Sequence, residues 1–413
     1  MEHQLFSLFR ASSGGSNLYR GRVPRTSPSP ADRALVEHAA AHGVTVSARQ
    51  LERWRADGLL PRNRVRGLGQ GRGSSSIPPE EAWQLVVWLG QHAGPGIRPG
   101  DLALQAFGEG LPVPEATVRN PFAAACKLPT AQDSPPGGTA EDVADANAVK
   151  CRRKDLLPSR IRSIDSAIAT ALESAGTSAA DVAQAILAPF GRPNPPTQEA
   201  WTRRDWVYSA TLAAIEGADS VNIAQMGAMA RSLAPAGIPA PAAEDLEFRW
   251  PGSEQEAEQL LTPDGGLAFL PDGSMTQVLL ELAAETPLSD LREAWDIAVH
   301  LPVWAVGLCD RVETALITRE FTEALTEWVS TMSGPARLRL VAAIDSVGQS
   351  PQKTAFDALV LLFERQALQA VLAQIPEAEV DNLTQPWMYP SFMVSFMTEQ
   401  ISTATAAPFR PRD

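Results

Sequence analysis

Apolar side chains recur at steps of three and four residues along much of the chain, which is the spacing of one face of an α-helix. The pattern is clearest in residues 163–176, 290–301 and 355–375. These segments lack the alternation of apolar and polar residues that is typical of half-buried strands. The chain is therefore expected to be mainly α-helical.

Two short helices are predicted near the amino-terminal end of the chain. The first spans residues 31–42 and ends at Gly43. The second starts after Ser47, whose hydroxyl suits an N-cap, and it stops at Gly58, before Pro61. The spacing of these signals predicts a helix, a short turn and a second helix.

The second of these helices has two different faces. At about 100° per residue, Leu51 and Trp54 lie on one side of the helix. Arg49 and Arg53 lie near the opposite pole. We therefore expect Leu51 and Trp54 to be buried and the two arginines to face outward.

A loop rich in glycine, serine and arginine follows over residues 62–79, and a further helix is predicted over 80–92. The loop resembles a nucleotide-binding loop only superficially. Its glycines do not follow the G-x-G-x-x-G spacing, the chain has no G-x-x-x-x-G-K-[ST] motif, and the loop follows a helix rather than a strand. Small hydroxyls and arginines on a flexible backbone instead suit phosphate oxygens.

Charge is distributed unevenly along the chain. Residues 1–80 carry 12 arginines and 6 acidic residues, a local charge of +6, within a chain whose net charge is −13. The remainder is strongly acidic. Only the amino-terminal end therefore suits a polyanion, through release of counterions from phosphates.

The predicted helices and loop together resemble the DNA-binding head of MerR-type transcription regulators over residues 31–91. The resemblance is carried by an L-x-x-W-x-x-x-G-L-L-P core, formed by Leu51, Trp54, Gly58, Leu59, Leu60 and Pro61. It implies a winged helix-turn-helix whose second helix enters the major groove of DNA. The chain departs from the family at Glu52, where a basic residue is usual, and after Gln91, where a glycine- and proline-rich stretch replaces the long dimerising helix.

The resemblance implies base contacts from the second helix and phosphate contacts from the wing. The expected DNA-binding residues are Arg49, Gln50, Arg53, Arg55, Arg62, Arg64, Arg66, Arg72 and Ser74. Auxiliary phosphate contacts are expected from Arg22, Arg25, Arg152, Arg153 and Lys154. For the cluster at residues 151–162, the alternative is that its basic side chains pair with acidic residues of the chain itself.

Proline, glycine and acidic tracts divide the chain into four expected parts. They are a disordered basic arm (1–28), a winged helix-turn-helix DNA-binding domain with accessory helices (29–128), a linker (129–148) and an acidic helical domain (149–405) with a subdivision near 233–253. The aromatic and methionine-rich run at 385–401 is expected to be core or, alternatively, a partner or dimer contact.

Other classes of protein are not supported by the residues. No apolar stretch is long enough to span a bilayer, and the start lacks the pattern of a secretory signal, so a cytoplasmic protein without membrane contact is expected. The three cysteines and five histidines form no metal-ligand spacing, and neither a cofactor nor an enzymatic activity is expected.

The sequence thus predicts a transcription regulator that binds double-stranded DNA through its head. Its helical carboxyl-terminal domain is expected to serve oligomerisation, as in a homodimer, or the binding of a protein partner or ligand. Two alternatives stay open. One is an adaptor for DNA architecture or processing, similar to excisionases, partition proteins or packaging proteins, and the other is an acidic helical scaffold for protein interactions.

Overall fold

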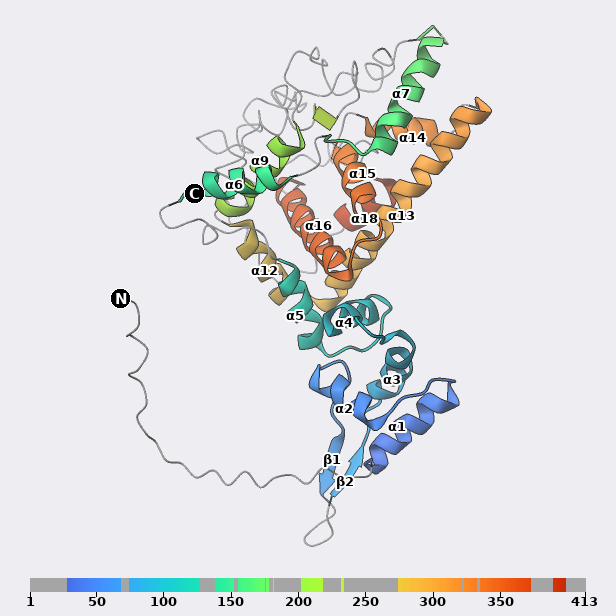
Figure 1. The fold of residues 1–413 in the computed structure, drawn as a ribbon, viewed down its shortest axis with the longest axis vertical. Coiled ribbons are helices and arrows are strands. Elements are labelled where there is room, and N and C mark those ends of the chain that lie inside the picture. Colours follow the sequence, from blue (N-terminus) through green and yellow to red (C-terminus); the bar gives the residue numbers. More distant parts are fainter. Residues whose placement is uncertain are drawn as a thin grey trace, which may run out of the picture. The chain divides into compact units, whose positions relative to one another are not determined.

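The computed structural model describes residues 28–67, 74–126, 138–151, 155–174, 202–217, 274–320, 323–332, 335–372 and 389–398, with a few isolated positions between them. The described chain is mainly α-helical, as predicted (Figure 1). Its contacts divide it into two compact units. The first unit comprises residues up to Ala56 together with Leu60–Gln91, and the second comprises Asp57–Leu59 and the chain from His92 onward.

The first unit contains the two short helices and the third helix that the sequence predicts. Its elements are α1 (Pro30–Ala41), α2 (Ala48–Ala56), β1 (Arg64–Gly67), β2 (Ser74–Ile77) and α3 (Glu81–His92). Helix α1 starts at Ser29, whose hydroxyl accepts a hydrogen bond from the backbone N–H of Asp32 at 3.1 Å. The turn after α1 passes through Gly43, whose φ of +77° is readily accessible only to glycine.

A single apolar core holds the first unit together. Leu35 of α1, Leu51 and Trp54 of α2, and Leu85 of α3 are almost completely buried. Helix α3 lies close to the turn between α1 and α2, because a side chain added at Gly90 would come within 2.3 Å of Val44. The predicted faces of α2 are confirmed: Leu51 and Trp54 are buried, and Arg49 and Arg53 are exposed.

The predicted loop after α2 is partly a hairpin of two short antiparallel strands. In its register Arg64 faces Ile77, Val65 faces Ser76, Arg66 faces Ser75 and Gly67 faces Ser74. The sequence pattern did not predict these strands, because their residues are polar or exposed and no apolar alternation marks them.

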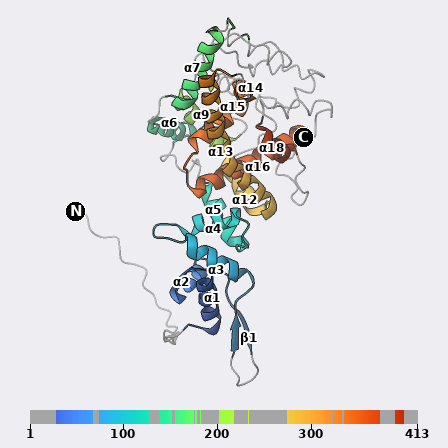
Figure 2. The ribbon, with the colours of Figure 1, turned by 90° about the vertical axis from the view of Figure 1, so that its right-hand side faces the viewer.

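The second unit is built around two long helices, α13 (Leu288–Thr318) and α16 (Pro351–Leu372), which pack against each other. Helices α7, α14 and α15 pack on α13, and α12 and α18 pack on α16 (Figures 1 and 2). The other helices are α4 (Pro99–Gly108), α5 (Glu115–Ala125), α6 (Ala140–Lys150), α7 (Ser159–Ser174), α9 (Arg203–Glu216), α12 (Met275–Glu285), α14 (Glu323–Thr331), α15 (Pro335–Asp345) and α18 (Ser391–Thr398).

The accessory helices belong to a different unit from the predicted one, because the sequence grouped residues 92–128 with the DNA-binding head. Helices α4 and α5 pack against α12, α13 and α16 and so belong to the second unit. Arg292 of α13 donates a hydrogen bond to the carbonyl of Phe107 at 3.1 Å and stacks on its ring. Gly108 lies so close to Trp295 that an added Cβ would be 2.1 Å from the indole nitrogen.

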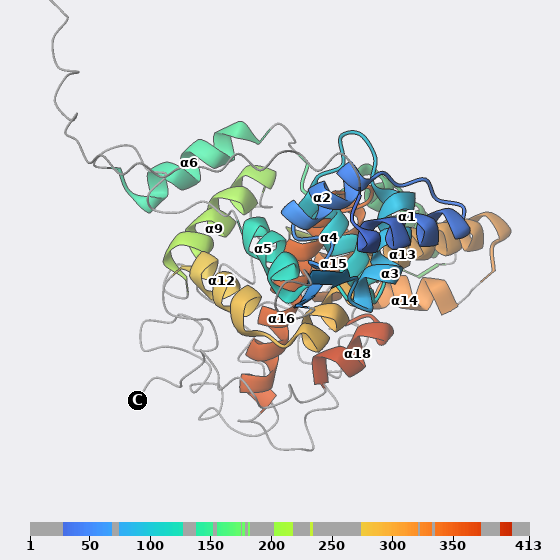
Figure 3. The same ribbon diagram turned by 90° about the horizontal axis from the view of Figure 1, so that it is seen from below.

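The predicted linker also differs, because its second half is helical. Thr139 and Asp142 form a capping box that starts α6, and Val143, Ala144 and Ala148 are buried. Helix α6 packs beside α9 (Figure 3). The acidic composition of residues 140–148 suggested a solvated tract, but the spacing of Val143, Ala144 and Ala148 places them together on one buried helical face. The arm at 1–27 and most of the subdivision near 233–253 lie outside the described residues.

The aromatic and methionine-rich run near the carboxyl-terminal end is core where it is described. Tyr389, Met393, Phe396 and Met397 are buried in the second unit. These four side chains therefore do not form a free surface for a partner. Among the helices in the described part of the chain, none combines the length and apolar character needed to cross a membrane.

Candidate nucleic-acid interface

Helix α2 presents a short exposed face with two cationic side chains. Arg49, Glu52, Arg53 and Ala56 are all exposed, and their spacing of three and four residues places them on one side of the helix. The opposite side, with Leu51 and Trp54, is buried in the core of the first unit. The core therefore fixes the direction in which both arginines point.

Gln50 has a different place from the two arginines. The backbone N–H and the hydroxyl of Ser47 both donate hydrogen bonds to the Gln50 side-chain oxygen, each at 2.8 Å. The backbone N–H of Gln50 donates to the Ser47 hydroxyl at 3.3 Å. This reciprocal capping box fixes the start of α2. The resemblance implied that Gln50 contacts bases. In the structure its side-chain amide oxygen already accepts two hydrogen bonds from Ser47.

Arg55 is likewise engaged within the first unit. Its guanidinium forms an ion pair with Asp32 of α1 at 2.7 Å and donates a hydrogen bond to Asn63 at 3.1 Å. Asn63 donates to Asp32 at 3.3 Å, and the Ser29 hydroxyl donates to Asp32 at 2.7 Å. This network joins the start of α1, the end of α2 and the segment that leads into the hairpin. The Ser29-x-x-Asp32 spacing is the local sequence signal of this network.

The Asp32 carboxylate is held in its charged form by this network. Burial alone would raise the pKa of Asp32, but hydrogen bonds from Ser29, Arg55 and Asn63 and the charge of Arg55 outweigh it, so the pKa lies below its usual value of 3.8. Because the unfolded chain has the higher pKa, this contribution to stability is complete at neutral pH. It is lost as the pH falls through the lowered pKa.

Asp32→Asn is therefore expected to destabilise the first unit by about 1–3 kcal/mol at neutral pH, because it removes the negative charge that pairs with Arg55 and places an amide NH2 group within the network. The difference from the unchanged protein should shrink as the pH falls below the usual pKa of 3.8 and through the lowered pKa of Asp32. Hydrogen exchange of peptides from residues 28–67, measured across pH, tests this. Glu37→Gln, at an exposed position of α1, is the matched control, and an equal effect in both variants would contradict the proposed network.

The hairpin carries its arginines on one face. Alternate residues of a strand lie on the same face, and so do directly paired residues of an antiparallel ladder. Arg64 and Arg66 therefore share one side with Ser75 and Ile77. Both arginines are exposed, as is Arg62 just before the hairpin. Ser74 lies opposite Gly67 on β2, and Arg72 lies outside the described residues.

The arginines of the two units differ in their partners. Within the described part of the chain, no carboxylate lies within ion-pair distance of Arg49, Arg53, Arg62, Arg64 or Arg66. Most of the described arginines in the second unit are paired, for example Arg119 with Glu115 and Arg311 with Glu327. In the described part of the first unit, the arginines without a carboxylate partner lie on α2, on the hairpin with the residue before it, and at Arg33 of α1.

In the second basic cluster, at residues 151–162, the described arginines pair with acidic residues of the chain itself, which was the alternative to phosphate contacts. Arg160 binds Asp310 and Glu313 of α13, and Arg162 pairs with Asp155 at 2.8 Å. The auxiliary residues Arg22, Arg25, Arg152, Arg153 and Lys154 lie outside the described residues.

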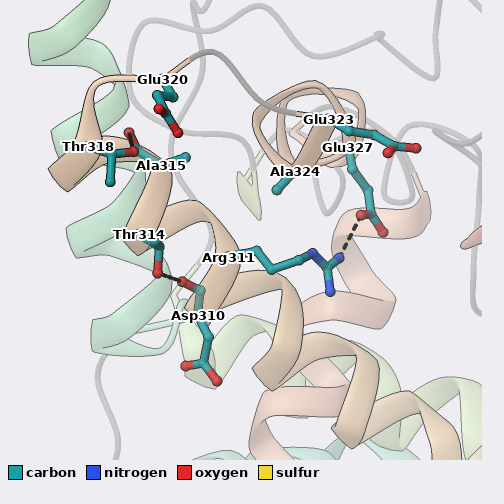
Figure 4. A pocket seen from close by; sticks show the side chains of 9 residues that line it. All are labelled: Asp310, Arg311, Thr314, Ala315, Thr318, Glu320, Glu323, Ala324 and Glu327. Carbon is teal, nitrogen blue, oxygen red and sulfur yellow. Dashed lines mark hydrogen bonds and ion pairs between the residues drawn. The ribbon is translucent and has the colours of Figure 1, made fainter.

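A pocket of about 710 Å³ in the second unit has the opposite charge. It lies between α13 and α14, and Arg311 reaches across it to Glu327 at 2.9 Å (Figure 4). Its other charged side chains are Asp310, Glu320 and Glu323. In the regions that the structure describes, no group of histidine, cysteine or acidic side chains is arranged to hold a metal ion. An acidic pocket of this kind repels phosphate, so the candidate interface for nucleic acid lies in the first unit.

The candidate interface offers guanidinium groups, which donate hydrogen bonds and carry positive charge. Guanidinium groups bind phosphate oxygens and the acceptor pair of guanine through bidentate hydrogen bonds. Comparison of the chain with family models, curated proteins and solved structures gives no match.

Proposed function

We propose that this protein is a transcription regulator that binds double-stranded DNA through a MerR-like winged helix-turn-helix in its first unit. The observation that carries the proposal is the set of exposed arginines without carboxylate partners on α2 and on the hairpin. In a chain with a net charge of −13, these solvated arginines form a local positive surface, which attracts a polyanion through release of its counterions.

The proposed mode of binding places α2 in the major groove. An α-helix with its side chains is about 10–12 Å across, and the major groove is about 12 Å wide. Arg49 and Arg53 then face base edges, whereas Arg64 and Arg66 of the hairpin bind phosphates and fix the register. The second unit, which carries most of the acidic residues, is proposed to serve oligomerisation or to bind a protein partner or ligand.

The double variant Arg49→Ala/Arg53→Ala is expected to lose discrimination among DNA sequences, by roughly 1–3 kcal/mol for each base contact. Arg64→Ala/Arg66→Ala is expected to weaken binding to all sequences about equally and to reduce the salt slope by about one for each arginine. The measurement is fluorescence anisotropy of the full chain with duplexes selected from a random pool, titrated over salt.

Arg204→Ala is the matched control, because Arg204 is exposed on α9 and has no carboxylate partner among the described residues. It should leave binding unchanged. Equal binding by the unchanged protein and both double variants would contradict the proposal. Binding at many sites without one preferred sequence, together with bending of the DNA, would instead support the role in DNA architecture or processing.

A further inference from the structure

Glu52 is an unusual residue for a surface that faces DNA. It is exposed on the same face of α2 as Arg49 and Arg53, and the part of the chain that the structure describes offers it no cationic partner. A carboxylate near phosphates is repelled, so it gains interaction energy in a groove only from a hydrogen-bond donor. In the major groove the donors are the amino groups of cytosine and adenine, and carboxylates characteristically accept from the N4 amino group of cytosine.

The two arginines have the complementary preference. Arginine binds guanine through two hydrogen bonds, to O6 and N7. Arg49 and Arg53 are one helical turn apart, which is about 6 Å along the axis at 1.5 Å per residue. This distance is close to two base-pair steps of about 3.4 Å each. The two side chains therefore reach different base pairs, with Glu52 between them in sequence.

The residue best suited to read adenine is withdrawn from this face. Asparagine and glutamine recognise adenine through the oxygen and nitrogen of their amide together. The amide oxygen of Gln50 accepts two hydrogen bonds from Ser47 at 2.8 Å, so a bidentate contact with adenine would break the cap of α2. The exposed face of α2 is thus left with guanine and cytosine readers.

We propose that α2 selects a site rich in G·C pairs, with Arg49 and Arg53 each on a guanine and Glu52 on the amino group of a nearby cytosine. Glu52 is a specificity-determining residue in this arrangement, because its charge also weakens binding to DNA that lacks the matching donor. This inference rests on the proposed binding of double-stranded DNA.

The test is selection from random duplex DNA with the full chain, followed by anisotropy on the selected duplex and on its single-base variants. The unchanged protein should enrich two guanines about two steps apart with a cytosine beside them. Glu52→Gln should keep the guanines, lower the preference for that cytosine by about tenfold, and bind unrelated duplexes more tightly. Glu37→Gln, which removes one negative charge from an exposed position of α1, should change neither the motif nor the preference.

The outcomes separate this inference from the proposed function. A selected motif made of A·T pairs, or a Glu52→Gln variant with unchanged discrimination at every position, overturns the inference and leaves DNA binding intact. Absence of binding to any duplex at low salt overturns the proposed function and the inference together. If Arg49→Ala/Arg53→Ala no longer selects the guanines and Glu52→Gln no longer selects the cytosine, the results support the proposed function and the inference.

Discussion

Arg337→Met is expected to destabilise the second unit by about 3–5 kcal/mol, because it leaves the carboxylate of Asp165 buried without its cation. Arg337 is 1% exposed and forms an ion pair with Asp165 of α7, which is 6% exposed. Trp328 of α14 donates a hydrogen bond to the same carboxylate at 3.0 Å. Arg337 also donates to the carbonyl of Leu233 at 3.1 Å. One guanidinium thus joins helices α7, α14 and α15.

Each charge of this pair depends on the other. Burial raises the pKa of Asp165, although the charge of Arg337 and its hydrogen bonds act in the opposite direction. Burial also lowers the pKa of Arg337, against the attraction of Asp165. Removing one partner therefore leaves the desolvation cost of the other without compensation. The double variant Arg337→Met/Asp165→Leu removes both charges and should recover most of the lost stability.

The measurement is urea unfolding of the full chain, with the midpoint compared between variants. Arg162→Met is the matched control, since Arg162 also pairs with an aspartate, Asp155, at 2.8 Å, but the two side chains are 49% and 57% exposed. An exposed pair of this kind contributes about 0–1 kcal/mol. If Arg337→Met were as mild as Arg162→Met, the buried pair could not be the link between these helices.

The buried ion pairs of arginine are a part of the fold that could not be predicted from the sequence. Among the described residues of the second unit, three arginines are buried, and each pairs with a carboxylate and packs on an aromatic ring. They are Arg337 with Asp165 and Trp328, Arg339 with Glu364 and Tyr389, and Arg365 with Glu293 and Phe396. In two of these sets the carboxylate lies 72 or 172 residues away in sequence, so no local pattern distinguishes these arginines from solvated ones.

The helices could be predicted where their signals are local. The 3.6-residue period predicts α7, α16 and the first part of α13, and Ser47, Gly58 and Pro61 bound the second helix of the first unit. The outward direction of Arg49 and Arg53 follows from the same period.

Local patterns did not indicate the contacts that form where a residue has two possible local roles or where packing decides. Gln50 occupies an expected base-contacting position, but its spacing from Ser47 also fits a capping box, and the cap is what forms. In the sequence, Arg55 cannot be told apart from the other arginines of its helix. Its ion pair with Asp32 forms only when the fold brings α1 and α2 together. The grouping of α4 and α5 with the second unit depends on their contacts with α12, α13 and α16, which no sequence period encodes.

Trp54→Ala is expected to destabilise the first unit by about 3–5 kcal/mol and to abolish DNA binding without removing any DNA contact. The Trp54 side chain is 1% exposed and anchors α2 on the core. Removing the indole leaves a cavity beneath the helix that carries Arg49 and Arg53, so both arginines lose their fixed direction. Peptide-resolved hydrogen exchange of the full chain should show faster exchange in residues 28–67 and 74–91.

Trp54→Phe separates the loss of volume from the loss of the indole nitrogen. The indole N–H of Trp54 is buried and, within the described chain, has no hydrogen-bond partner, so replacing it with a C–H costs no hydrogen bond. The phenylalanine variant should therefore retain most of the stability and most of the DNA affinity. Because α13 and α16 belong to the other compact unit, their exchange should stay slow in both variants. Fast exchange there in Trp54→Ala would show that the two units unfold together. DNA binding that survived the unfolding of α2 would move the candidate interface away from that helix.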